Sequence, residues 1–221
     1  MKGPDGFYAK VLKRILDVLC SALVLLVFCW LYGLIALLVR IKLGSPVIYK
    51  ANRPGRIDPR TGEERIFRLY KFRSMTNETD ENGKLLPDSR RLTHFGRMLR
   101  ATSLDELPEV FNILKGDMSV VGPRPLAVSY LQYYTPEEHH RHDVRPGLTG
   151  LAQVSGRNGI SWEQKFALDL EYIRELSFPK DVKILAVTVI KVFKREGIGQ
   201  GEAAPVSLSV ERRKAEVTKD V

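Results

Sequence analysis

The longest apolar segment of the chain lies near its N-terminus. Residues 18–39 carry no charge and are bounded by Asp17 and Arg40. As an α-helix these 22 residues would extend about 33 Å, enough to cross the roughly 30 Å hydrocarbon core of a bilayer. The pattern predicts a membrane helix rather than a fully buried helix of a soluble protein.

Basic residues flank this segment on both sides, whereas a spanning helix normally shows an excess on one side only. They are Lys2, Lys10, Lys13 and Arg14 before it, and Arg40, Lys42, Lys50 and Arg53 after it. A re-entrant helix, with both ends on the cytoplasmic side, would explain this balance. Such a helix needs a break, and Gly33 is the local candidate because no proline occurs between Pro4 and Pro46. We expect the re-entrant form; the sequence leaves a spanning helix open.

The chain beyond the apolar segment predicts short strands and helices. Residues 46–50 and 65–75 are rich in β-branched and aromatic side chains, and the turn-rich stretch 52–63 separates them. Helical periodicity starts at Phe95, resumes at Leu107 and stops at Gly116, a residue type that often ends helices. A further short strand is expected at 118–121.

The C-terminal part of the chain predicts two more elements. Ser161 and Gln164 have the spacing of a capping box, which predicts a helix start. Residues 182–195 fit either a strand or a helix that Asp181 caps. As a helix they would place several lysines beside a broad apolar face, as interfacial helices do.

These elements predict a mostly helical α+β fold. A membrane-embedded, re-entrant N-terminal helix would be followed by a small β-hairpin and interfacial amphipathic helices around the active site. We expect three parts: a membrane anchor at 1–45, a catalytic domain at 46–200 and a flexible tail at 201–221.

Composition adds the chemistry of the partner. The net charge of +9 and the pI near 9.6 favour an anionic partner, such as phosphorylated small molecules, anionic lipid or nucleic acid. No nucleic-acid-binding motif occurs, so a nucleic-acid binder and a structural membrane scaffold are the weaker alternatives. Cys20 and Cys29, the only cysteines, both lie in the apolar segment and can form neither a disulfide framework nor a zinc site.

Asp105 and Glu106 are adjacent acids at an expected helix start. Ser103 and Glu106 fit a capping box, so the pair can be explained by helix capping alone. The same pair could instead attack phosphorus and share a magnesium ion with substrate phosphates.

Three arginines lie in tight loops rather than on helix faces. Arg124 stands between two prolines, and Arg145 and Arg157 lie in glycine-bearing turns. Restricted backbones preorganise guanidinium groups for phosphate, so we expect a phosphate-binding cage. At the membrane entry, Lys13, Arg14 and Asp17 fit interfacial anchoring and contact with a lipid phosphate equally well.

Several segments together resemble one known family. They are KRILD (13–17), YKFRSM (70–75), SLDELPEVFNILKGDMSVVGPRP (103–125) and DVRPGLTGLAQVSGRN (143–158), in this order. The chain resembles the bacterial sugar transferases over about residues 8–197, in particular the small monotopic phosphoglycosyl transferases that start glycan assembly with sugars such as diacetylbacillosamine. The family usually has Ser-Pro in the middle of the membrane helix, where this chain has Cys29-Trp30.

The resemblance implies transfer of a phosphosugar from a UDP-sugar to polyprenyl phosphate, with release of UMP, at the cytoplasmic face of the bacterial inner membrane. It implies Asp105 as the nucleophile of a ping-pong mechanism and Glu106 as its partner in binding Mg²⁺ or handling protons. The implied phosphate-binding residues are Arg124, Arg145, Arg157 and, more weakly, Lys71, Arg73 and Arg100. The sequence does not specify the sugar.

Overall fold

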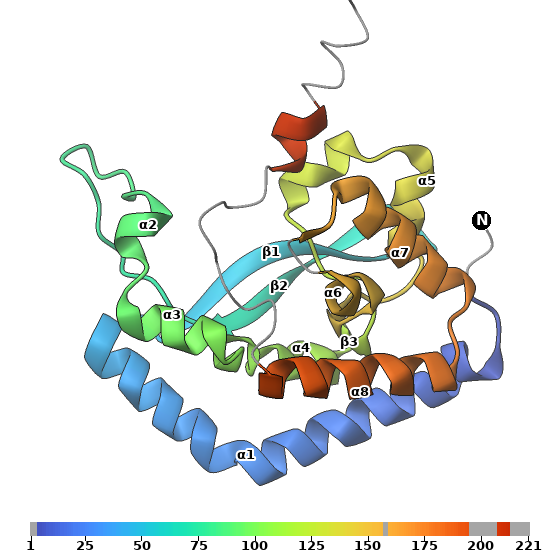
Figure 1. Ribbon diagram of the computed structural model, residues 1–221, viewed down its shortest axis with the longest axis horizontal. Helices are drawn as coiled ribbons and strands as arrows, with labels where there is room; N and C mark the ends of the chain where they lie inside the picture. The colour runs from blue at the N-terminus through green and yellow to red at the C-terminus, as the bar shows by residue number, and fades with distance from the viewer. Residues whose placement is uncertain (1–3, 157–158, 195–206, 213–221) are drawn as a thin grey trace, which may run out of the picture.

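The computed structural model describes residues 4–156, 159–194 and 207–212. Helices dominate, around one antiparallel β-hairpin, so the predicted mostly helical α+β fold is confirmed (Figure 1). The α-helices are α1 (Lys13–Leu43), α2 (Asp88–Arg91), α3 (His94–Ala101), α4 (Glu109–Lys115), α5 (Pro136–His139), α6 (Leu151–Ser155), α7 (Trp162–Arg174) and α8 (Phe178–Lys194). The strands are β1 (Ile48–Ile57), β2 (Glu64–Phe72), β3 (Ser119–Val121) and β4 (Gly147–Thr149). The remaining short helical segments are the π-helix η1 (Tyr8–Leu12) and the 3-10 helices η2 (Leu104–Glu106), η3 (Val128–Tyr133) and η4 (His140–His142).

The hairpin of β1 and β2 is longer than its sequence predicts. β1 continues to Ile57 through Pro54 and Gly55, which we expected in a loop. A two-stranded sheet leaves each strand an open edge, so a proline can sit there without breaking a hydrogen bond of the ladder. Glycine is needed at position 55, because a Cβ there would lie 2.9 Å from the carbonyl oxygen of Arg65. On β2, Phe67 and Leu69 pack against the end of α4 and the residues that follow it.

The helical periodicity that starts at Phe95 and resumes at Leu107 corresponds to two helices, α3 and α4, with the short turn η2 between them. Ser103, directly before η2, has a left-handed backbone (φ 56°), and its side chain makes no capping hydrogen bond. The predicted capping box of Ser103 and Glu106 is therefore wrong. Gly116 ends α4 with φ 89°, as predicted.

The predicted capping box that starts α7 is confirmed, with both hydrogen bonds between Ser161 and Gln164 present. Residues 182–194 are helical, as part of α8, so the strand alternative is wrong. Asp181 lies inside α8 and binds Tyr8, Lys13 and Tyr172 instead of capping the helix. Of the expected flexible tail, residues 207–212 are described, and Leu208 among them is fully buried against α7.

α1 is in contact with the rest of the protein at both of its ends. At its start, Lys13 Nζ lies 2.6 Å from Asp181 Oδ2. At its end, the guanidinium of Arg73 donates to the carbonyl oxygens of Leu43 and Ser45. Figure 1 shows that the helix bends near its middle, so that both limbs rise toward the same domain.

The middle of α1 presents apolar side chains outward. The exposed residues include Leu23, Leu26, Val27, Trp30 and Leu34. Within the described part of the chain, the helical stretch Tyr8–Leu43 is the one helix long and apolar enough to cross a membrane. An exposed apolar middle between two anchored ends supports a re-entrant helix.

This arrangement predicts that both ends of α1 lie on the cytoplasmic side. In a Cys20→Ser, Cys29→Ser background, a single cysteine is introduced before α1 (Asp5→Cys) or in the loop before α2 (Glu81→Cys). We expect a membrane-impermeant maleimide to label both variants in inside-out vesicles and neither in intact spheroplasts. Labelling of the two cysteines from opposite sides would contradict the re-entrant arrangement.

Candidate functional site

The turn η2 presents two adjacent acids directly before α4. Leu104 and Leu107, on either side of the pair, pack against the cluster that joins the end of α1 to β2 and α3. The left-handed Ser103 precedes the turn, and strained backbone of this kind is common at functional sites. Packing and a constrained turn thus fix where Asp105 and Glu106 point.

Asp105 is buried, with 8 % of its surface exposed, yet it is unpaired: no described residue donates a hydrogen bond to its carboxylate or forms an ion pair with it. Burial raises the pKa of Asp105, Lys71 and Arg100 oppose this shift, and the charge of Glu106 adds to it. Poor solvation and the lack of a fixed donor leave the Asp105 oxygens available to react.

Glu106 is held by two cations. Its Oε1 lies 2.6 Å from Lys71 Nζ and 2.8 Å from Arg124 Nη2. Burial alone would raise the pKa of Glu106, but Arg124 and Lys71 outweigh it and lower the pKa to about 2. Glu106 is therefore ionised at neutral pH and orients both cations beside Asp105.

Glu109 is a third acid at this site, which the sequence analysis missed. Its Oε1 lies 3.1 Å from Lys71 Nζ, and the side chain is almost fully buried. Burial raises the pKa of Glu109 to about 7; Lys71 opposes the shift and Glu106 adds to it. Its position three residues after Glu106, on the same helix face, is the signal that could have identified it.

The side chain of Arg124 lies beside Glu106, and its backbone is held by Arg141. The carbonyl oxygen of Arg124 accepts a hydrogen bond from Arg141 Nη2 (2.9 Å), and Arg141 forms a buried ion pair with Asp169 (2.6 Å). The Arg124 side chain is 45 % exposed, and Glu106 raises its pKa. The guanidinium is thus preorganised but still accessible to a ligand.

The other predicted phosphate-binding residues have different positions. Arg100 donates to Ser74 (2.9 Å) and is close enough to lower the pKa of Asp105. Arg73 is buried at the end of α1, and Arg145 donates to the carbonyl oxygen of Gly116 (3.1 Å), at the opposite end of α4 from the acids. Arg157 lies outside the described residues. Of the other two loop arginines, Arg124 lies beside the acidic pair and Arg145 does not.

Lys13, Arg14 and Asp17 all have partners inside the protein. Lys13 pairs with Asp181, and Arg14 donates to the carbonyl oxygens of Ile113 (2.5 Å) and Leu114 (2.8 Å) at the end of α4. Asp17 accepts hydrogen bonds from Ser119 (3.0 Å) and Val120 (2.9 Å). These contacts attach α1 to the domain; contact with a lipid phosphate stays a prediction that they do not support.

The acids could hold a metal ion only with help from a substrate. Among the described residues, no group of three or more His, Cys, Asp or Glu side chains is arranged to bind a metal. Magnesium often uses one or two protein carboxylates and completes its shell with water and substrate phosphates. The free carboxylate of Asp105 and the second oxygen of Glu106 fit that mode.

Comparison with known proteins identifies relatives along most of the chain. The sequence model of the family described as bacterial sugar transferase matches residues 8–195. An uncharacterised sugar transferase of Bacillus subtilis, EpsL, is 49 % identical over 196 residues, which cover 86 % of this chain and 91 % of that protein.

Longer relatives match over only part of their length. The undecaprenyl-phosphate galactose phosphotransferase of Salmonella typhimurium is 37 % identical over 86 % of this chain and 42 % of its own length. The UDP-glucose:undecaprenyl-phosphate glucose-1-phosphate transferase of Escherichia coli is 39 % identical over 83 % of this chain and 40 % of its own length. The chain thus corresponds to about two fifths of these longer proteins.

The pKa of Glu109 predicts a dependence of stability on pH. Between its ordinary pKa of 4.5 and about 7, the folded protein keeps a proton on Glu109 that the unfolded chain has released. The free energy of unfolding should therefore fall as pH rises through this window and level off above it. Between pH 5 and pH 8 the melting temperature of Glu109→Gln should fall less than that of the wild type, and the difference between the two falls should be on the order of 5 °C. The exposed control Glu81→Gln should keep the wild-type slope, and an equally steep slope in Glu109→Gln would refute the assignment.

Proposed function

The chain belongs to the bacterial sugar transferase family, and on this premise we propose that it transfers a phosphosugar from a UDP-sugar to polyprenyl phosphate and releases UMP. One observation carries the mechanism: a buried, unpaired carboxylate, Asp105, lies beside an acid whose two cations are already in place. The Salmonella typhimurium and Escherichia coli relatives act on undecaprenyl phosphate according to their names, which supports the lipid acceptor.

In the first half-reaction, an oxygen of Asp105 attacks the β-phosphorus of the UDP-sugar. The bond from that phosphorus to the bridging oxygen breaks, UMP leaves with the bridging oxygen, and the sugar phosphate is attached to Asp105 as an acyl phosphate. Arg124 and Lys71 supply positive charge where the phosphate charge develops. Glu106 holds these two cations in position.

In the second half-reaction, a phosphate oxygen of the polyprenyl phosphate attacks the same phosphorus. The acyl phosphate bond breaks, Asp105 regains its carboxylate, and the product is a polyprenyl diphosphate sugar. The acceptor can approach from the bilayer because η2 lies next to the membrane helix. Tyr32 of α1 donates to the carbonyl oxygen of Leu107 (2.7 Å) and packs edge-on against the partly exposed Phe111.

Magnesium, held by Asp105 and Glu106 together with the donor phosphates, would offset the negative charge of the diphosphate.

The protein would lie at the cytoplasmic face of the inner membrane. α8 begins at the start of α1, where Asp181 pairs with Lys13, and exposes Phe178, Val182, Val189 and Ile190, as an interfacial helix would. Figure 1 shows both helices on the same side of the hairpin. The Salmonella typhimurium and Escherichia coli relatives are named for galactose and glucose transfer, respectively, and not for diacetylbacillosamine. The sugar that this chain transfers is therefore left unassigned.

Removal of the proposed nucleophile should abolish the first half-reaction. Asp105→Asn keeps the volume of the side chain but lacks the attacking charge, so UMP release should fall at least about a thousand-fold. The assay measures UMP across a panel of UDP-sugars, with polyprenyl phosphate and magnesium, and membrane association is checked by flotation. The exposed control Asp88→Asn should release UMP like the wild type. Turnover retained by Asp105→Asn would exclude Asp105 as the nucleophile.

A further inference from the structure

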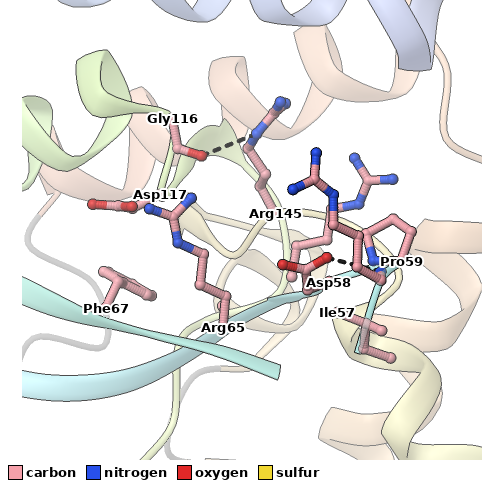
Figure 2. Close-up of a pocket in the computed structure, with 11 residues that line it drawn as sticks. Ile57, Asp58, Pro59, Arg65, Phe67, Gly116, Asp117 and Arg145 are labelled. Atoms are coloured by element: carbon pink, nitrogen blue, oxygen red, sulfur yellow. Dashed lines mark hydrogen bonds between the residues drawn. The ribbon is translucent and has the colours of Figure 1, made fainter. Parts of the chain in front are cut away.

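A second cluster of positive charge lies at the other end of α4. A hollow of about 360 Å³ is bordered by four arginines and two aspartates, which we call the arginine pocket. Its charged residues are Arg56, Asp58, Arg60, Arg65, Asp117 and Arg145. They come from three places: the closed end of the hairpin (the end of β1, the turn and the start of β2), the residues after α4 and the loop before β4. Figure 2 labels Asp58, Arg65, Asp117 and Arg145 among them.

The arginine pocket is separate from the acidic pair. Arg65 and Lys71 share one face of β2, and their separation of six positions corresponds to about 20 Å along a strand. Lys71 contacts the start of α4 through Glu109, whereas Arg145 contacts its end through Gly116. A phosphate in this hollow therefore cannot be the one that Asp105 attacks.

The positive charge of the pocket is not neutralised from within. Within the described part of the chain, no carboxylate lies within 4 Å of the guanidinium groups of Arg56, Arg60, Arg65 or Arg145. Asp58 instead accepts a hydrogen bond from the backbone of Arg60 (2.9 Å). Arg145 is half-buried, and burial together with the neighbouring Arg14 and Arg56 lowers its pKa. The four arginines thus outnumber the two aspartates of the lining, and none of the four guanidinium groups is in an ion pair with a described carboxylate.

The chemistry of the lining selects the ligand. Guanidinium groups bind phosphate through paired, charge-assisted hydrogen bonds. The volume falls within the range of small-molecule sites, about 300–1,000 Å³, so a phosphate with an attached organic group fits. Gly116 lies next to both the pocket and the start of α1, because Arg14 lies against it and Arg145 donates to its carbonyl oxygen.

We propose that the arginine pocket binds the phosphate group of an anionic ligand, at a site distinct from the acidic pair. The phosphate can come from a lipid headgroup in the cytoplasmic leaflet or from a soluble phosphate ester. This proposal does not depend on the reaction assigned to Asp105.

The test compares two double variants with the same change in charge. Arg60→Gln/Arg65→Gln replaces two exposed lining residues. Their side chains form no ion pair or hydrogen bond with any described residue, so folding should be preserved. Arg68→Gln/Arg90→Gln removes two exposed arginines outside the pocket and serves as the control. Binding of inorganic phosphate to the full chain in neutral detergent is measured by calorimetry. Retention of phosphatidylglycerol from mixed micelles is measured by native mass spectrometry.

We expect the pocket variant to bind phosphate at least about ten-fold more weakly than the wild type and the control. If a lipid headgroup is the source, the wild type and the control also retain phosphatidylglycerol and the pocket variant does not. If a soluble ester is the source, phosphate binding differs while lipid retention is the same in all three proteins. Equal phosphate binding and equal lipid retention in both double variants would overturn the proposal. Asp105→Asn should bind phosphate at the pocket like the wild type, which separates this result from any failure of the proposed reaction.

Discussion

The ion pair between Lys13 and Asp181 is the contact on which the placement of the membrane helix depends. Both side chains are buried, and a buried charge is tolerated only when it is paired and hydrogen-bonded. Tyr8 and Tyr172 donate to the two oxygens of the same carboxylate, so η1, α1, α7 and α8 meet at one group. These contacts hold the start of α1 against α7 and α8 and so set the direction in which α1 leaves the domain.

The fixed start of α1 in turn positions α4. Arg14 binds the last carbonyl groups of α4, and Tyr32, further along α1, binds Leu107 just before α4 begins. Side chains of α1 thus hold α4 at both of its ends. Its first turn carries Glu109 beside Asp105 and Glu106, and the residues after its last turn border the arginine pocket. The seven-residue helix α4 therefore lies between two charged sites, the acidic pair with its two cations and the arginine pocket.

The parts of this structure that the sequence predicts are those determined locally. An uninterrupted apolar run, a glycine in the left-handed conformation at position 116 and the capping box at Ser161 each depend on neighbours in the chain. The capping box at Ser103 is a local prediction that is wrong, because Ser103 has a left-handed backbone and makes no capping hydrogen bond. The other features that the sequence missed arise where distant segments meet. β1 continues through Pro54 because β2 pairs with it. Arg145 lies at the end of α4, where it donates to the carbonyl oxygen of Gly116. From the sequence, Glu109 resembles an exposed residue on a helix surface. In the structure it is in an ion pair with Lys71 of β2, a contact that the sequence does not indicate.

The most direct test of this account is the chemical state of Asp105 during turnover. The protein is incubated with a UDP-sugar that supports UMP release, without polyprenyl phosphate, then quenched, digested and analysed by mass spectrometry. The account predicts a peptide that contains Asp105 and carries the mass of one sugar phosphate, and loss of this adduct when polyprenyl phosphate is added. UMP release that requires the lipid acceptor, with no adduct on Asp105, would contradict it.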